Sequence, residues 1–455
     1  MGDSQADFSK NVFLVGGITL ACVLVHFIYK FFISNKENDQ QLVHETESEP
    51  VAPVAEAASQ QAAPETRPSG KAKKRTTWKT KSEEFSHPWL LKNLKGHPGN
   101  VLHMDFSANG KYMASTCDDG SVLLWDVRDL GQKEHKSLRV NLEFDHASHV
   151  FWTPDSKAFL VHTVKENHIV AYKIERKKDG TIGAAAPAAT LERMHDDKVI
   201  GFGISISSNG RWVMSCSAGG DLLVRDLSGK VAHRRQVRVK EPHSARVSPC
   251  GRYIFVCGAA AGIESLDVQY EEGRLKRAGD GPELPGHAAG VYDLAFGMDS
   301  SYVAIAYMDA TWKLFNVTGL LASGSGKAQL LESGRFSPGG QPPRLALSPD
   351  AQVLAVAVDS SVQLYDTYTG KLFGTIDNAF TGLVTSMVFD STNKHLFVAG
   401  DKVIRVFHNV CGLYTTIGHC WRLMRGNETS ATTERLKKTM AECKEQLERF
   451  NVKYE

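Results

Sequence analysis

Short apolar runs bounded by turn residues recur along most of this sequence, and the segment 94–127 shows the pattern most clearly. An alternating run begins at Val101, and turns at 107–110 and 118–120 separate it from two further apolar runs. Alternation of apolar and polar residues between tight turns is typical of antiparallel β-strands. The segment therefore predicts three consecutive strands of one sheet.

Six later segments repeat this arrangement of runs and turns with weaker signals. They span residues 144–174, 194–227, 239–268, 284–317, 344–367 and 383–409. Seven copies of one three-stranded unit predict an array of small sheets, and closing such an array into a ring would leave few unpaired strand edges.

The first unit carries the most specific residues. It opens with Gly96-His97, turns at an Asp-Gly pair and closes with Trp125-Asp126. This spacing resembles the WD repeat, in which each repeat forms one blade of a β-propeller. The resemblance implies an all-β fold, a seven-bladed WD-repeat β-propeller over residues 87–410. It also implies that the strand 89–94 closes the last blade.

Four polar or aromatic side chains of the first unit form a candidate structural tetrad, namely His97, Ser115, Asp119 and Trp125. In a blade, their imidazole, hydroxyl, carboxylate and indole N–H groups could join in one hydrogen-bonded chain. The same residue types also occur in hydrolases. However, Ser115 lies within a predicted strand, and no G-x-S-x-G turn surrounds it. We therefore predict a structural network, no catalytic residues and no enzyme activity.

Residues 1–35 are predicted to form a membrane anchor, because 12–29 contain no charged residue and are long enough to cross a bilayer as a helix. A cleaved signal peptide is an alternative, but bulky residues around Tyr29 replace an A-x-A-like cleavage site. A buried core helix is another alternative, although it would be expected to show a polar face. Lys10 precedes the apolar run, whereas Lys30 and Lys36 follow it, which favours a cytosolic carboxyl side.

Residues 36–86 are predicted to be a disordered linker, rich in Glu, Ala, Pro and Ser, that changes from acidic to basic along its length. Its basic part includes Lys73, Lys74 and Arg75, and a second basic cluster lies between two repeats at Arg234, Arg235 and Arg238. Both clusters are candidate contacts for RNA or an acidic partner. The alternative is that they are solvated loop charges.

The carboxyl-terminal extension, 411–455, contains a predicted amphipathic helix over 430–452. Its apolar residues fall at alternating spacings of four and three, at Leu436, Met440, Cys443, Leu447 and Phe450. This stripe predicts packing against the propeller, and a partner helix is the alternative.

The net charge of +2 requires no polyanionic partner, and the eight cysteines include no C-x-x-C pair. Scattered cysteines favour free thiols in a reducing compartment. The histidines form no H-E-x-x-H motif, so no metal ion or cofactor is expected.

The complete order of anchor, linker, propeller and terminal helix resembles the transducin β-like branch of the WD-repeat family. This resemblance implies a monomeric, non-enzymatic scaffold for protein–protein interaction. It further implies a single-pass protein of the endoplasmic reticulum membrane with its propeller in the cytosol. Its partners would include an endoplasmic-reticulum stress-sensor kinase, and its processes would be the unfolded protein response or translation control. The alternative function is an RNA-binding or ribosome-associated adaptor that uses the basic clusters.

Overall fold

The computed structural model describes residues 85–454 apart from 133–134, 136, 179, 192–194, 206–211, 260–261, 272–273, 286, 324–326 and 427–429. Its contacts divide the chain into two units, 1–80 and 81–455, and all described residues belong to the second unit. The predicted membrane helix at 12–29, the linker as far as 84, and Lys73, Lys74 and Arg75 therefore lie outside the described residues. No helix among the described residues is both long and apolar enough to cross a membrane.

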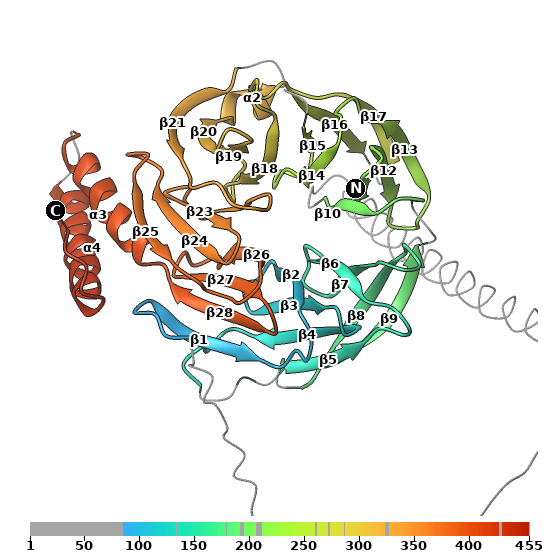
Figure 1. The fold of residues 1–455 in the computed structure, drawn as a ribbon, viewed down its shortest axis with the longest axis horizontal. Helices are drawn as coiled ribbons and strands as arrows, with labels where there is room; N and C mark the ends of the chain where they lie inside the picture. Colours follow the sequence, from blue (N-terminus) through green and yellow to red (C-terminus); the bar gives the residue numbers. More distant parts are fainter. Residues whose placement is uncertain are drawn as a thin grey trace, which may run out of the picture. The chain divides into compact units, whose positions relative to one another are not determined.

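Seven four-stranded antiparallel sheets are arranged as the blades of a propeller (Figure 1). The first blade contains β2 (Val101–Phe106), β3 (Tyr112–Cys117), β4 (Ser121–Asp126) and β5 (Ser137–Asn141). The second contains β6 (Ala147–Trp152), β7 (Ala158–Thr163), β8 (Ile169–Arg176) and β9 (Ile182–Leu191). The third contains β10 (Val199–Ile204), β11 (Trp212–Ser217), β12 (Asp221–Asp226) and β13 (Val231–Gln236). The fourth contains β14 (Pro242–Val247), β15 (Tyr253–Gly258), β16 (Ile263–Glu271) and β17 (Arg274–Asp280).

The remaining blades continue the same order. The fifth contains β18 (Val291–Phe296), β19 (Tyr302–Tyr307), β20 (Thr311–Asn316) and β21 (Gln329–Arg335), with the short helix α2 (Thr318–Ser323) between its last two strands. The sixth contains β22 (Arg344–Leu347), β23 (Val353–Val358), β24 (Ser361–Asp366) and β25 (Leu372–Ile376). The seventh contains β26 (Val384–Phe389), β27 (His395–Gly400) and β28 (Val403–His408), and its fourth strand is β1 (Leu90–Lys95). The predicted seven-bladed all-β propeller is thereby confirmed.

The ring is closed by pairing between the two ends of the propeller sequence. Strand β1 runs antiparallel to β28, with Leu90 opposite Phe407 and Leu94 opposite Ile404. The expected closure by residues 89–94 is confirmed. Phe85, which the sequence assigns to the linker, also belongs to this region, because its ring lies 6.2 Å from that of Phe407 and 4.2 Å from the guanidinium of Arg405.

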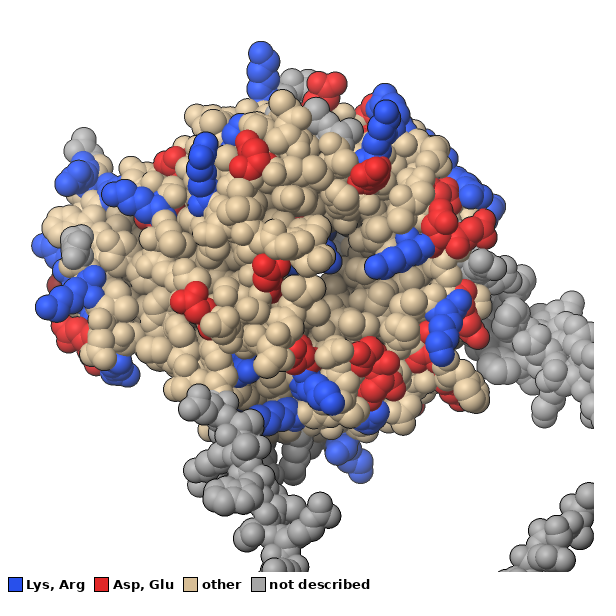
Figure 2. Space-filling model, viewed as in Figure 1, with Lys and Arg blue, Asp and Glu red and all other residues tan. Residues whose placement is uncertain are grey.

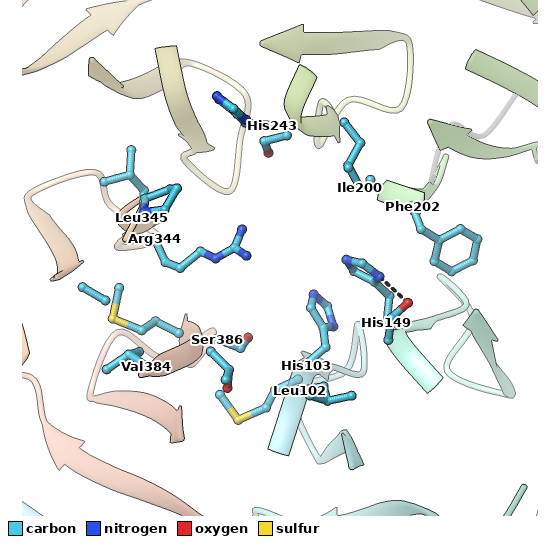
Figure 3. Close-up of a pocket in the computed structure, with 18 of the residues that line it drawn as sticks. Leu102, His103, His149, Ile200, Phe202, His243, Arg344, Leu345, Val384 and Ser386 are labelled. Atoms are coloured by element: carbon cyan, nitrogen blue, oxygen red, sulfur yellow. Dashed lines mark hydrogen bonds between the residues drawn. The ribbon is translucent and has the colours of Figure 1, made fainter. Parts of the chain in front are cut away.

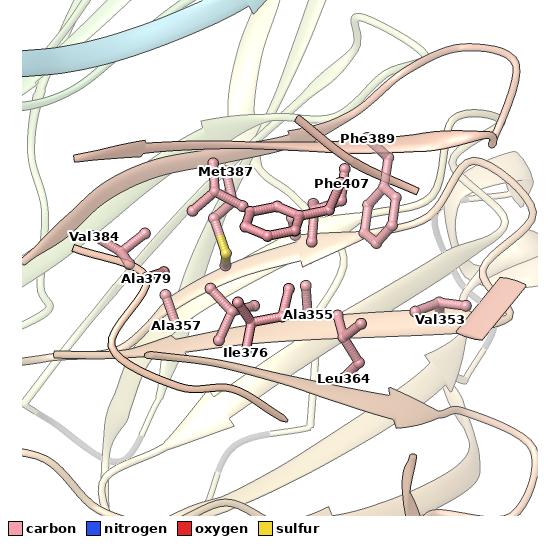
Figure 4. Packing of buried hydrophobic residues seen from close by; sticks show 14 of the residues in the cluster. Val353, Ala355, Ala357, Leu364, Ile376, Ala379, Val384, Met387, Phe389 and Phe407 are labelled. Atoms are coloured by element: carbon pink, nitrogen blue, oxygen red, sulfur yellow. The ribbon is translucent and has the colours of Figure 1, made fainter. Parts of the chain in front are cut away.

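Adjacent blades share apolar cores. In β23 every residue of the sequence VLAVAV is buried, as expected for a strand covered on both faces. Residues of the sixth and seventh blades, including Val353, Leu364, Met387 and Phe407, form one such cluster (Figure 4). Face-to-face packing of neighbouring sheets accordingly stabilises the ring.

The outermost strands β5, β9, β13, β17, β21 and β25 are not predicted by the sequence analysis, which identified three strands per blade. These strands are largely exposed, as in β9 and β21, so they lack the apolar alternation that marks a half-buried strand. As a consequence, Arg234 and Arg235 lie within β13 (Val231–Gln236), and only Arg238 lies in the connection that follows.

The inner strand of each blade, the first strand in sequence and the one nearest the axis, carries a recurrent irregularity. In six of the seven inner strands the register shifts between the first and third residues, as between Val101 and His103 in β2 and between Ala147 and His149 in β6. A β-bulge redirects side chains relative to a regular strand. These bulges help to determine which polar side chains point into the channel along the axis of the ring.

Two helices follow the last blade and pack as a pair beside the sixth blade (Figure 1). The sequence analysis missed α3 (Val410–Met424), whose N-cap Asn409 accepts a hydrogen bond from the amide of Gly412. Helix α4 (Ser430–Arg449) is shorter than the expected 430–452, because Asn451 adopts a positive φ that ends it. Buried Met440, Cys443 and Leu447 of α4 share one apolar cluster with Val410, Ile417 and Cys420 of α3.

Candidate functional site

Three members of the predicted tetrad form a buried network in the first blade. The hydroxyl oxygen of Ser115 lies 2.7 Å from Nε2 of His97 and accepts a hydrogen bond of 2.8 Å from the indole N–H of Trp125. All three side chains are buried. Burial lowers the pKa of His97 to about 4, so its ring is neutral at neutral pH. The network links the loop before the blade to its second and third strands.

The fourth member, Asp119, does not join this hydrogen-bonded network, contrary to the sequence-based expectation. Its Oδ1 accepts from the amide and hydroxyl of Ser121, and its Oδ2 accepts from Arg139 at 2.5 Å. Nδ1 of His97 has no hydrogen-bond partner among the described residues. Burial raises the pKa of Asp119, but hydrogen bonds from Cys117, Ser121 and Arg139 outweigh it and lower that pKa to about 2. The carboxylate is thus held by its own turn and by β5, which the sequence analysis did not foresee.

The third blade contains a more complete network that the sequence analysis missed. Nδ1 of His195 lies 2.9 Å from Oδ2 of Asp221, and its Nε2 lies 2.8 Å from Oγ of Ser215. Gly219 occupies the expected aspartate position, and Asp221, two residues later, supplies the carboxylate. This is the connectivity of a serine hydrolase triad. Ser215 is 0 % exposed within a strand, so the arrangement serves to hold the blade together.

The basic cluster in the folded region is largely neutralised by acidic neighbours. Arg234 donates to both oxygens of Asp221, at 2.8 and 3.0 Å. Arg235 lies 3.0 Å from buried Glu264 and 2.6 Å from Asp280, and Arg238 pairs with the same two carboxylates at 3.4 and 3.3 Å. The structure therefore brings these arginines together as parts of ion pairs. Those pairs reduce the positive charge that they offer to a nucleic-acid backbone.

One group of side chains in the described part of the chain has ligand atoms close enough for a metal ion. Atoms of His97, Cys117 and Asp119 lie within 4.8 Å of one another. Burial raises the pKa of Cys117 to about 12, whereas metal ligation takes the thiolate. Since His97 and Asp119 already hold the first blade together, we assign this group a structural role.

The axial channel contains a cavity of about 730 Å³ at the end where the inner strands begin. Its wall combines His103 of β2, His149 of β6, His243 and Arg246 of β14, and Arg344 of β22. Figure 3 shows the three histidines and Arg344 around the channel. A second cavity of about 430 Å³ lies toward the other end and is lined by phenylalanines from five inner strands: Phe106, Phe151, Phe202, Phe296 and Phe389. The channel is consequently polar at one end and aromatic at the other.

Comparison with known proteins places the propeller in a family. The WD domain, G-beta repeat model matches residues 88–126, 282–316 and 370–408. Transducin beta-like protein 2 of Homo sapiens is 33 % identical over 372 residues, which cover 81 % of this chain and 83 % of that protein. The chain belongs to the transducin beta-like protein 2 family.

Two further relatives are similar to this chain over very different lengths. Transducin beta-like protein 2 of Mus musculus is 31 % identical over 408 residues, covering 88 % of this chain and 90 % of that protein. A component of chromatin assembly factor 1 from Gallus gallus is 29 % identical over 118 residues, covering 25 % of this chain and 20 % of that protein. The similarity to the transducin beta-like protein 2 family thus extends well beyond the repeats that the family model matches.

The surface of this family member carries both signs of charge, interspersed around a central hollow in the view down the propeller axis (Figure 2). Large apolar side chains are also exposed at the end where the inner strands begin. Phe144 is 93 % exposed in the loop before β6, and Val164 and Leu383 line the mouth of the larger cavity. We call Phe144, Val164 and Leu383 the mouth residues. They give this end of the propeller an apolar rim, which is a common feature of protein-binding surfaces.

Proposed function

We propose that this protein is a non-enzymatic scaffold that binds protein partners through the channel end bearing the mouth residues. WD-repeat propellers in general act in protein interaction. We choose this end because of the position of Phe144. Its φ of 57° is rare for a bulky residue, and the loop is tied down by bonds from Lys165 to the Phe144 carbonyl and the Asp145 carboxylate. An aromatic ring held in solvent by a fixed loop loses little conformational entropy on binding.

We further propose that the scaffold is a monomer tethered to the endoplasmic reticulum membrane by a single helix at 12–29, with its propeller in the cytosol. The uncharged run 12–29 and the lysines that follow it support this arrangement. The free cysteines of the described region, which form no disulfide there, support a reducing compartment. The proposed partners are an endoplasmic-reticulum stress-sensor kinase and the ribosome, and the proposed processes are stress signalling and translation control.

The decisive experiment compares Phe144→Glu with Met298→Glu in the full-length protein. Met298 is 59 % exposed in the turn after β18, at the opposite end of the channel, so it provides a matched exposed apolar residue. Proximity labelling in intact cells, followed by recovery of labelled proteins, would report the partners of each variant. We expect Phe144→Glu to lose at least one reproducible partner that both the wild type and Met298→Glu retain.

The opposite outcome, loss of partners only in Met298→Glu, would place the binding surface at the aromatic end of the channel. Identical labelling by all three proteins would reject binding through the mouth residues. Treatment of captured partners with nuclease and high salt tests the RNA adaptor, because phosphate contacts weaken steeply with salt. Release of all partners by nuclease would favour the adaptor over the scaffold.

A further inference from the structure

Three side chains from separate blades converge on the open centre of the larger cavity. Arg344 at the start of β22, His103 of β2 and His149 of β6 extend toward one another across the channel (Figure 3). The rings of His103 and His149 lie 5.0 Å apart between centroids. Among the described residues, the guanidinium of Arg344 makes no ion pair and no hydrogen bond. A guanidinium without a partner in a polar channel is a ready donor for an anion.

Each of the three described carboxylates nearby accepts hydrogen bonds from other partners. Asp293 accepts from the Ser244 hydroxyl at 2.8 Å and pairs with Arg246 at 3.2 Å. Asp359 accepts from the backbone amides of residues 340–341. Asp105 accepts from the amide of Trp152 at 2.7 Å, and burial raises its pKa to about 7. Arg246 is therefore neutralised by Asp293, whereas Arg344 keeps its charge available.

A chain of hydrogen bonds fixes which nitrogen of His149 carries a proton. The side-chain amide of Asn167 donates to the backbone carbonyls of His195 and Asp197, so its Oδ1 faces Nε2 of His162 at 2.7 Å. His162 must donate there, and its Nδ1 then accepts from the Ser148 hydroxyl at 2.8 Å. Because that hydroxyl has one proton, the Ser148 oxygen must accept from Nδ1 of His149 at 2.9 Å.

The consequence is that Nε2 of neutral His149 presents a lone pair to the channel. His103 is the other tautomer. Its Nδ1 accepts from the amide of Val150 at 3.4 Å, so its Nε2 carries the proton. Burial lowers the pKa of His103 to about 3 and the pKa of His149 well below its usual value, with Arg246 and Arg344 adding to both shifts. The wall thus offers a cation, an N–H donor and an acceptor.

We propose that this wall binds a phosphate group that retains one proton, either inorganic phosphate or the monoanion of a phosphomonoester. Unprotonated oxygens accept from Arg344 and from Nε2–H of His103, and the P–OH group donates to Nε2 of His149. Sulfate and phosphodiesters carry no such proton at neutral pH, so they leave the lone pair of His149 facing an anionic oxygen. Recognition of the proton distinguishes this site from a surface that simply attracts anions.

The test is calorimetric titration of the full-length protein in detergent with inorganic phosphate, glycerol phosphate, dimethyl phosphate and sulfate at neutral pH. We expect phosphate to bind and sulfate and dimethyl phosphate to bind roughly 10- to 100-fold more weakly, which is the range for one charge-assisted hydrogen bond. Tighter binding of glycerol phosphate as the pH falls toward its second pKa would identify a monoester as ligand. Binding of inorganic phosphate alone would identify the free ion.

Variants separate the proposed contacts from general effects of the channel. Arg344→Gln and His149→Phe are each expected to weaken phosphate binding by roughly 10-fold or more. His243→Phe is the matched control, because His243 lies on another part of the wall beside Tyr292, with ring centroids 6.4 Å apart. Arg344 is exposed to the channel, so its variant remains informative if His149→Phe fails to fold.

Several results would overturn the proposal. These are absence of phosphate binding at millimolar concentration, equal affinity for sulfate and phosphate, and unchanged binding in Arg344→Gln. An equal loss in His243→Phe and His149→Phe would also overturn it, because the effect would then belong to the channel as a whole.

Discussion

Oδ2 of Asp221 lies 2.9 Å from Nδ1 of His195, and the same carboxylate accepts two hydrogen bonds from Arg234. This aspartate connects the buried interior of the third blade to its outer strand. We predict that Asp221→Asn lowers the free energy of unfolding by about 1–3 kcal/mol, because it weakens both links and leaves a buried imidazole imperfectly paired. Chemical denaturation would measure the change.

The same substitution at a matched aspartate of the fifth blade provides the control for Asp221→Asn. Asp309 lies 3.6 Å from Nε2 of His287, but His287 is partly exposed and the pair is longer. Asp309→Asn should therefore change the unfolding free energy by less than about 0.5 kcal/mol. Equal effects of the two exchanges would contradict a special role for Asp221.

Trp125 is predicted to contribute through both volume and its hydrogen bond to Ser115. Trp125→Ala should destabilise the protein by about 3–5 kcal/mol, since the indole is fully buried. In double-mutant cycles, Trp125→Phe should couple to Ser115→Ala by about 0.5–3 kcal/mol. Coupling to Asp119→Ala should be much smaller, because Asp119 bonds to other partners. Strong coupling to Asp119 would restore the four-membered chain inferred from the sequence.

Acidification is predicted to destabilise the propeller through its buried histidines. The pKa of His97 is about 4 in the folded protein and near 6.5 when unfolded, so the unfolded chain binds the proton first as the pH falls. The contribution of neutral His97 to the free energy of unfolding is thus fully present above pH 6.5. It is lost between roughly pH 6.5 and 4, and the loss for His97 alone is about 3 kcal/mol. Unfolding curves at stepped pH should show a shallower decline for His97→Gln. An unchanged slope in that variant would assign the effect to other groups.

The proposed cytosolic orientation predicts that neither N-x-[ST] sequence carries a glycan. These sequences begin at Asn316 and Asn427, and Asn427 lies outside the described residues. The Asn316 side chain accepts from the amide of Thr318 at 3.0 Å and is only partly exposed. A glycosidase-sensitive mass shift that disappears in Asn427→Gln would place the propeller in the lumen, and protease access to the carboxyl terminus in intact microsomes would support the cytosol.

The inner three strands of each blade were predictable because their local patterns are strong, as in the apolar runs and Asp-Gly turn around Asp119. The outer strands were not, because a strand exposed on most sides has no distinctive alternation. Helix α3 was missed because Gly412, Gly418 and the two threonines at 415–416 obscure its periodicity.

The candidate sites were likewise predictable from the sequence only in part. The His97–Ser115–Trp125 network was predictable because its residues lie within one repeat. The role of Asp221 was not, because it depends on a turn that shifts the carboxylate by two positions. The grouping of Arg344, His103 and His149 follows only from closure of the ring, since these residues lie in the first, second and sixth blades.

Closure by β1 also determines when the protein can finish folding during its synthesis. Leu94 pairs with Ile404, 310 positions later (404 minus 94). At about 5–20 residues per second, the ribosome needs roughly 15–60 s to make the intervening chain. Throughout that interval the edge of β1 has no partner strand, and the apolar face of the first blade stays uncovered until β28 has been synthesised. A nascent chain of this kind is an expected client of chaperones that protect unpaired strand edges until translation is nearly complete.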